Sequence, residues 1–232
     1  IPADVTEDTL ISQISSLNSD NSVNGIILQM PIPDHLNREK LINSIDPKKD
    51  VDGLTITNQE LLEENDPKAI IPATPKGVLS LLKFYGIDVQ GKKVTVVGRS
   101  KLVGAPLATL LRNIGANVTV CHSQTLDLKQ ETRNAEILMV AVGKPNLITK
   151  DHVSPGQAII DVGINVINLQ TADSKQQTAI SGKQSVKLTG DVAYAEVEPI
   201  VSAITPVPGG IGPMTVASLF ENLLEAYKKQ TI

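Results

Sequence analysis

The turn between Gly98 and Gly104 could bind a phosphate group. An apolar stretch at 93–98 predicts a buried strand, and Arg99 and Ser100 follow Gly98 before a helix starts. A strand, a glycine turn and a helix start direct backbone N–H groups and the positive end of the helix dipole at an anion. Arg99 adds a cation that can make forked hydrogen bonds to a phosphate. The alternative is a plain strand-to-helix turn, because the spacing is not that of G-x-G-x-x-G.

The tip of the next predicted strand points to the kind of nucleotide. This strand covers 117–121 and ends at His122 and Ser123. Dinucleotide folds that bind NAD carry an Asp or Glu about 20 residues past the glycine turn, where it binds the ribose 2′-hydroxyl. Here the corresponding tip has no acid, and Arg99 stands in the turn. An arginine without an acid is the combination expected for a 2′-phosphate, so we predict NADP as the cofactor.

A second group of candidate residues lies before the nucleotide-binding turn. Asp50 and Asp52 belong to the acidic turn Asp-Val-Asp-Gly; a calcium loop is excluded, because Lys48 and Gln59 stand where acids are needed. Two interpretations stay open: a structural Asx turn, or a carboxylate that binds an amidine-like N–C–N edge such as that of a pterin. Gln29 ends a predicted strand, where it could orient a substrate or a base or simply be solvated.

The segment 206–215 is rich in proline and glycine and includes Pro208, Gly209 and Gly210. Proline restricts φ, and glycine permits positive φ and a close backbone approach. Such a segment suits a flat ligand lying against the backbone. A stiff connector between lobes is the alternative.

The elements that must position these residues follow from the hydrophobic periodicity. We predict strands at 23–30, 93–98, 117–121, 136–142, 157–162 and 188–191. Helices are predicted at 6–17, 36–45, 74–85, 104–114, 125–133, 149–153 and 214–229, with Thr6 and Thr74 as N-caps. Residues 174–187 lack a pattern and are expected to form an exposed hairpin or loop.

Strands that alternate with helices predict an α/β fold with a doubly wound parallel sheet. We expect two lobes around a cleft, the larger being Rossmann-like. Residues 1–75 would form the smaller lobe, completed by the C-terminal segment 206–232, and residues 76–205 the nucleotide-binding lobe.

Composition excludes several classes of function. The net charge is −4, and the chain has three Tyr, two Phe and no Trp, so surfaces on which nucleic-acid bases could stack are scarce. No apolar run is long enough for a membrane span, and the N-terminus has no signal-peptide pattern. No metal-ligand spacing occurs. The single cysteine, Cys121, cannot form an internal disulfide and fits a reducing cytoplasm.

Six motifs in order along nearly the whole chain resemble those of one family, the bifunctional methylenetetrahydrofolate dehydrogenase/methenyltetrahydrofolate cyclohydrolases. They lie at 25–33, 46–53, 72–77, 97–106, 121–123 and 208–215. The resemblance implies NADP-dependent oxidation of 5,10-methylenetetrahydrofolate and hydrolysis of the methenyl product to 10-formyltetrahydrofolate. It also implies a cytoplasmic homodimer.

The resemblance also implies roles for individual residues. Asp52 would hold the pterin, and Gln29 would support a catalytic lysine. The cofactor would contact Gly98, Arg99, Ser100, Ser123 and Ile164, and the folate and nicotinamide would lie against Pro208, Gly209 and Gly210.

One departure from the family is large. The catalytic Tyr-x-x-x-Lys motif of the family does not occur: Val89, Glu198 and Thr231 stand four residues after the three tyrosines. We expect that the chain is an incomplete version of a complete enzyme. The alternatives are a truncated or inactive relative that binds NADP or folate without turnover, and a monofunctional dehydrogenase.

Overall fold

The computed structural model of the protein describes residues 2, 4–168 and 186–231. The chain forms two compact units. The first consists of residues 1–91, 100–117 and 213–232, and the second of residues 92–99 and 118–212.

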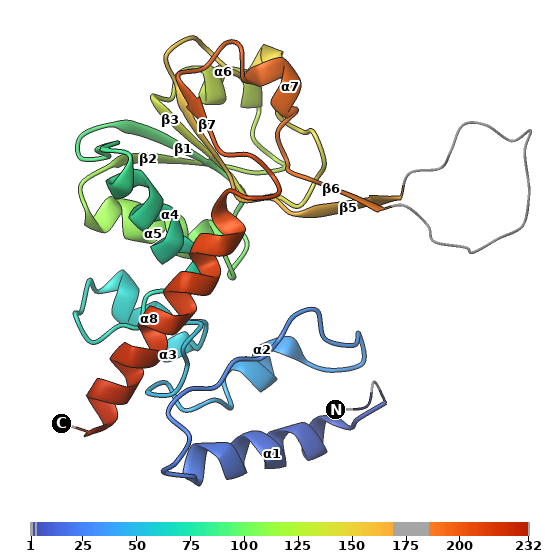
Figure 1. The fold of residues 1–232 in the computed structure, drawn as a ribbon, viewed down its shortest axis with the longest axis vertical. Helices are drawn as coiled ribbons and strands as arrows, with labels where there is room; N and C mark the ends of the chain where they lie inside the picture. Colours follow the sequence, from blue (N-terminus) through green and yellow to red (C-terminus); the bar gives the residue numbers. More distant parts are fainter. Residues whose placement is uncertain (1, 3, 169–185, 232) are drawn as a thin grey trace, which may run out of the picture. The chain divides into compact units, whose positions relative to one another are not determined.

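The second unit is built on a five-stranded sheet of the described residues, in the order β2-β1-β3-β4-β7. Its central pairs, β1–β3, β3–β4 and β4–β7, are all parallel (Figure 1). The strands are β1 (Lys93–Val97), β2 (Asn117–Cys121), β3 (Ile137–Val140), β4 (Ala158–Asp161) and β7 (Ala203–Ile204).

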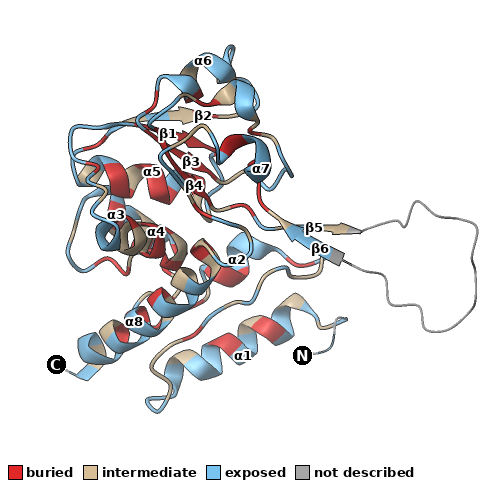
Figure 2. Ribbon diagram, turned by 45° about the horizontal axis from the view of Figure 1, so that its top comes forward, coloured by how far each residue is buried: buried red, intermediate tan, exposed pale blue. Residues whose placement is uncertain are grey.

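The sequences of the central strands explain their position. Every residue of β3 and β4 is buried, as is β1 after Lys93 (Figure 2). Continuous apolar runs of this kind suit parallel strands that are covered on both faces. The core of the unit includes Val97, Leu138 and Ile159, each at most 2% exposed.

Short helices follow the strands of this unit: α6 (Leu128–Arg133), the 3₁₀ helix η1 (Lys150–His152) and α7 (Tyr194–Val197). The Asp127 carboxylate caps α6 by accepting the Gln130 N–H. Strands β5 (Asn165–Asn168) and β6 (Val186–Thr189) pair antiparallel and project as a two-stranded arm (Figure 1). Of the predicted loop 174–187, residues 174–185 lie outside the described residues.

The first unit is helical. It contains α1 (Glu7–Ser19), α2 (Arg38–Ile42), α3 (Ile56–Glu63), α4 (Ala73–Phe84), α5 (Gly104–Asn113) and, from Pro213 onward, α8 (Ile211–Thr231). The predicted N-cap of α1 is confirmed, because the Thr6 hydroxyl accepts the Thr9 N–H. Leu10 and Ile14, one turn apart, bury the same face of this helix (Figure 2).

Two predictions for this unit are wrong in detail. The predicted strand 23–30 makes a single bridge, between Ile26 and Asp50, and no ladder; a strand exists only where a neighbour pairs with it along its length. Helix α4 begins at Ala73 with Pro72 as its N-cap, so Thr74 lies inside the first turn, where its hydroxyl contacts that of Thr215. Proline is tolerated at position 75, because N–H groups of the first turn have no partner within the helix.

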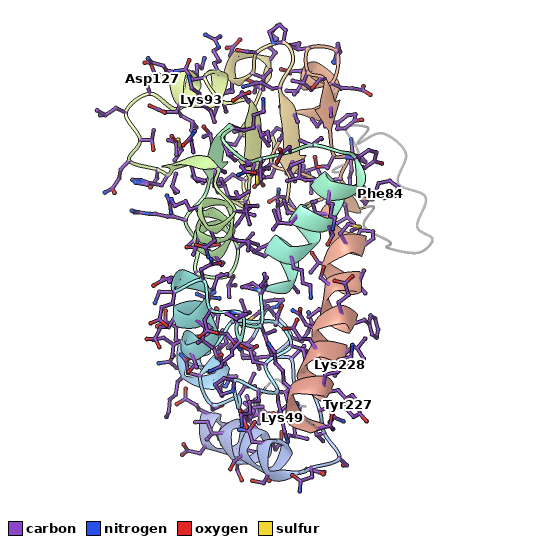
Figure 3. The ribbon with its side chains drawn as sticks, turned by 90° about the vertical axis from the view of Figure 1, so that its left-hand side faces the viewer. Lys49, Phe84, Lys93, Asp127, Tyr227 and Lys228 are labelled. Carbon is purple, nitrogen blue, oxygen red and sulfur yellow. The ribbon has the colours of Figure 1, made fainter. Side chains whose placement is uncertain are left out.

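Helix α8 buries only part of its apolar surface. Leu219 packs on a core formed by Val51, Ile70 and Ala226. Phe220 and Leu224, however, are 69% and 55% exposed, and Figure 3 shows Tyr227 pointing outward from the same helix.

The α/β class and the parallel, Rossmann-like sheet are therefore confirmed. The predicted cleft and the predicted domain boundaries stay predictions. The sequence analysis did not find α3, α7, β5 and β7, which are short or carry few apolar residues at regular spacing.

Candidate active site

The glycine turn at the end of β1 is built so that only glycine fits. Gly98 has φ +124°, and a Cβ at this position would collide with the carbonyl oxygen of Ala141. The Gly98 N–H donates to the Cys121 carbonyl at 2.9 Å and so joins the ends of β1 and β2. The turn thus brings bare backbone to the carboxyl edge of the parallel sheet, where nucleotides bind in folds of this kind.

The Arg99 side chain reaches the residues that follow β2. It is exposed, and its Nη2 lies 3.4 Å from Oε1 of Gln124, the neighbour of the exposed Ser123. The His122 ring helps to shape this tip, since its Nδ1 accepts the Gln124 N–H at 3.2 Å. The Arg99 guanidinium therefore lies beside the residue that follows Ser123, at the strand tip where a 2′-phosphate is predicted.

Ser100 has a local role in addition to the predicted one. Its Oγ accepts the N–H groups of Val103 and Gly104, at 3.3 and 3.4 Å, at the start of α5. The hydroxyl proton is still available to an anion at this helix end.

The two aspartates of the Asp-Val-Asp-Gly turn have different environments. Asp50 is 1% exposed, and its carboxylate accepts the N–H groups of Gly53 and Thr55 and the amide of Asn58 at 2.8–3.0 Å. Asp50 is thus the structural residue of the turn. Asp52 is half-buried, and within the described residues its carboxylate has no hydrogen-bond donor.

Burial, together with the nearby charge of Asp50, raises the pKa of Asp52 to about 6. A carboxyl group that is partly desolvated and has no partner loses its hydration without compensation. A ligand that offers two N–H donors would supply that compensation.

The loop that carries Asp52 is held from two sides. A Cβ on Gly53 would lie 2.8 Å from the backbone nitrogen of Pro72, so the turn and the start of α4 pack closely. Asn222 of α8 is fully buried, and its Nδ2 donates to the carbonyls of Val51 and Ile71 at 2.9 and 2.8 Å. The Asn222 Oδ1 accepts from Lys76 Nζ at 2.8 Å, so every polar atom of this amide group is engaged.

The remaining predicted residues are solvent-accessible. Gln29 is exposed, and its Nε2 donates to the Met30 carbonyl at 2.9 Å. In the second unit, Ile164 is 62% exposed, and Pro208 and Gly209 are exposed in the turn after β7. A Cβ on Gly210 would lie 2.5 Å from the Pro206 carbonyl oxygen, which explains the glycine there.

Sequence reasoning missed two buried acids, Asp161 at the end of β4 and Asp191 after β6. The sequence signals were an acid directly after the apolar run 158–160 and an acid directly after Gly190. Within the described parts of the chain, no helix is long and apolar enough to cross a membrane.

Comparison with known proteins identifies two matching family models. The model of the tetrahydrofolate dehydrogenase/cyclohydrolase catalytic domain matches residues 1–52, and that of the NAD(P)-binding domain of the same family matches residues 72–231. The protein from Wolinella succinogenes named bifunctional protein FolD is 47% identical over 228 residues, which are 98% of this chain and 74% of the relative. The protein of the same name from Francisella tularensis subsp. holarctica is 45% identical over 225 residues, 97% of this chain and 74% of the relative.

Solved structures give the same result. A bifunctional FolD methylenetetrahydrofolate dehydrogenase/cyclohydrolase from Campylobacter jejuni superimposes with a TM-score of 0.87 at 41% identity, over 98% of this chain and 75% of that chain. The Trypanosoma brucei methylenetetrahydrofolate dehydrogenase-cyclohydrolase, solved with NADP cofactor and an inhibitor, has a TM-score of 0.87 at 34% identity, over 99% of this chain and 75% of that chain.

Proposed function

This chain belongs to the tetrahydrofolate dehydrogenase/cyclohydrolase family, and we propose that it oxidises 5,10-methylenetetrahydrofolate with NADP⁺ and hydrolyses the methenyl product to 10-formyltetrahydrofolate. The observation that carries the assignment to folate is the Asp52 carboxylate, half-buried and without a donor among the described residues, in a loop held by Asp50 and Asn222.

The cofactor fits the turn after β1. The bare backbone of Gly98 lies at the carboxyl edge of the sheet, where the pyrophosphate would bind, and Arg99 and Ser123 would supply a cation and a hydroxyl for the 2′-phosphate. Gly98, Arg99, Ser100, Ser123 and Ile164 are the residues that we propose to hold it. Bound NADP⁺ supplies the acceptor for the hydride that leaves the methylene carbon.

Asp52 would anchor the pterin in both reactions. Two N–H groups of the pterin edge would donate to its two oxygens, a forked arrangement that also fixes the orientation of the ring. The Pro208–Gly210 turn would lie along the folate and nicotinamide, and Gln29 would orient the group that transfers protons. The hydride step then needs mainly alignment of the two ligands.

Hydrolysis needs water activation and a proton acceptor. The Tyr-x-x-x-Lys motif that serves this purpose in the family does not occur in these 232 residues. The alternative candidates are a relative that binds NADP or folate without turnover and a monofunctional dehydrogenase.

A spectrophotometric assay with 5,10-methylenetetrahydrofolate distinguishes the candidates, with NADP⁺ and NAD⁺ compared at equal concentration. We expect NADPH formation that is faster than NADH formation, and decay of added methenyltetrahydrofolate above the uncatalysed rate. Asp52→Ala should weaken both activities and Arg99→Ala only the first. Reduction of neither cofactor by the wild-type protein would refute the dehydrogenase assignment.

We further propose that the protein is a cytoplasmic homodimer that binds folates and no nucleic acid. The net charge of −4 and the few aromatic residues support the last point, and the single, buried cysteine is in keeping with a reducing compartment.

A further inference from the structure

Two buried carboxylates lie at the carboxyl edge of the parallel sheet. Asp161 is the last residue of β4, Asp191 follows β6, and they are 3% and 0% exposed. Among the described residues, neither forms an ion pair, and every hydrogen bond to their carboxylates comes from a neutral donor. A buried charge that is held only by dipoles is costly for the fold, so a role beyond stability is worth testing.

Asp161 links the end of β4 to the segment after β6. Its Oδ1 accepts the N–H groups of Gly163 and Asp191, both at 3.0 Å. Its Oδ2 accepts the Val192 N–H at 2.9 Å. Burial, the largest influence, raises the pKa of Asp161 to about 6, although these backbone hydrogen bonds act in the opposite direction.

Asp191 links the same segment to the residues after β3 and to the arm. Its Oδ2 accepts the N–H groups of Val142 and Gly143 at 2.6 and 2.9 Å. Its Oδ1 accepts Nδ2 of Asn165, the first residue of β5, at 2.8 Å. The Asp191 side chain thus joins the segment after β6 to the segment after β3 and to the first residue of β5.

The backbone is shaped around the pair. A Cβ on Gly163 would collide with the Asp191 carboxylate, and a Cβ on Gly190 with the Asp161 carboxylate. Because neither glycine has a side chain, the two carboxylates can pack closely against the backbone at these positions.

The strand order predicts which half of a dinucleotide would lie near these two acids. The tip of β2 is the predicted site of the adenosine 2′-phosphate, and the Gly98 turn after β1 that of the pyrophosphate. In the order β2-β1-β3-β4, a dinucleotide that extends along the carboxyl edge would place its nicotinamide over the ends of β3 and β4. Ile164, exposed directly after Gly163, belongs to this edge.

On the basis of the proposed function, we propose that Asp161 and Asp191 are positioning residues for the nicotinamide half of the cofactor, and that their negative charge favours its oxidised form. The oxidised nicotinamide ring carries a positive charge and the reduced ring is neutral. Buried carboxylates that are screened little by solvent attract the former and not the latter. The pair would thereby favour binding of NADP⁺ and release of NADPH.

Asp191→Asn tests the electrostatic part with little change in shape. In this variant the amide oxygen can still accept the N–H groups of Val142 and Gly143, and the NH₂ group can face Asn165 once the Asn165 amide reverses. The Kd values of NADP⁺ and NADPH are measured by titration at a pH well above the value of about 6 for Asp161. We expect the ratio of Kd for NADP⁺ to Kd for NADPH to rise about threefold or more.

A second variant, in which residues 165 and 191 exchange their side-chain types, should restore the ratio of the two Kd values. In the double variant Asp191→Asn/Asn165→Asp, the carboxylate and the amide trade places across the same hydrogen bond, and the ratio should return to within about twofold of the wild-type value. Asp151→Asn is the matched control, because it removes a carboxylate of the same unit that is 54% exposed and paired with Lys129. The control should leave the ratio unchanged.

Each outcome is decisive. An unchanged ratio in folded Asp191→Asn, or a ratio that the charge exchange does not restore, overturns the proposal while NADP binding by the wild type stands. If Asp191→Asn does not fold, Asp161→Asn replaces it, and failure of both to fold means that the pair serves only the fold. A wild-type protein that binds neither NADP⁺ nor NADPH refutes the proposed function itself, and this inference with it.

Discussion

Asp50 and Asp52 stand two positions apart, and the turn uses only the first carboxylate for its own backbone, while we propose that the second binds a ligand. Asp50 satisfies the donors of the turn. Asp52, with its raised pKa and no donor among the described residues, would lose its charge at a higher pH than an ordinary aspartate.

This difference predicts a pH dependence of folate binding. Below a pH of about 6 the carboxyl of Asp52 in the free protein is protonated and can no longer accept two hydrogen bonds. The affinity for a tetrahydrofolate analogue should therefore fall as the pH decreases through about 6, instead of near the usual value of about 4. Isothermal titration across this range measures the effect. Asp52→Asn should bind weakly at every pH, and a variant that retained the wild-type profile would contradict the assignment.

Arg99 is expected to discriminate between the two nicotinamide cofactors. Its guanidinium lies at the tip of β2, and removing a charge-assisted contact to phosphate costs about 1.5–3 kcal/mol. Arg99→Ala should weaken NADP⁺ binding by this amount and leave NAD⁺ binding nearly unchanged, as measured by titration. Lys129→Ala, which removes an exposed cation of the same unit, serves as the control. Equal losses for both cofactors would mean that Arg99 does not bind the 2′-phosphate.

At the level of elements, the turn after β1 depends on a glycine for two reasons, positive φ and lack of space. Gly98→Ala should lower the free energy of unfolding by about 2–5 kcal/mol, the sum of backbone strain and overpacking against the Ala141 carbonyl. Gly156→Ala is the matched control, because Gly156 has φ +86° but a Cβ added there would meet no atom within 4 Å. It should cost about 1–2 kcal/mol from strain alone. If denaturant unfolding shows the same loss of free energy for both variants, the backbone has shifted to relieve the collision with the Ala141 carbonyl.

Helix α8 holds the loop that carries Asp52 with a buried amide, that of Asn222. Asn222→Ala would leave the carbonyls of Val51 and Ile71 without this donor and Lys76 without this acceptor, at a cost of about 1–3 kcal/mol. Denaturant unfolding of the variant measures this cost. Glu221→Ala, on the same helix, removes only an exposed partner 3.6 Å from Lys76 and should cost less than about 1 kcal/mol. If Asn222→Ala does not change the free energy of unfolding, water replaces the amide.

At the scale of the whole molecule, cofactor binding and stability are linked. A ligand that binds only the folded protein stabilises it by about 2.7 kcal/mol at a hundredfold excess over Kd. NADP⁺ should therefore raise the thermal midpoint of the transition that includes the second unit, and NAD⁺ at the same concentration should raise it less. Scanning calorimetry tests this expectation, and in Arg99→Ala the difference between the two cofactors should vanish. A larger shift with NAD⁺ would contradict the cofactor preference.

The sequence by itself determined the class of fold, and it predicted the cofactor turn and the candidate site residues. Continuous apolar runs at β1, β3 and β4 indicated buried parallel strands, and strand lengths were nearly right, because this pattern depends on local residue types. Gly98, Arg99 and Asp52 could be predicted as site residues because glycine at a strand end, an arginine in a turn and an acidic turn are local signals.

Only the tertiary structure decided which of two similar groups has which task. The folded turn decides that the Asp50 carboxylate is hydrogen-bonded, whereas that of Asp52 has no donor among the described residues. Asn222, which is 171 positions from Val51, holds the loop that carries both aspartates. The same holds for Asp161 and Asp191, whose carboxylates accept backbone N–H groups from the segments that follow β3, β4 and β6. A carboxylate in a sequence has no local mark of burial or of its donors, because desolvation and hydrogen bonding are properties of the packed neighbourhood.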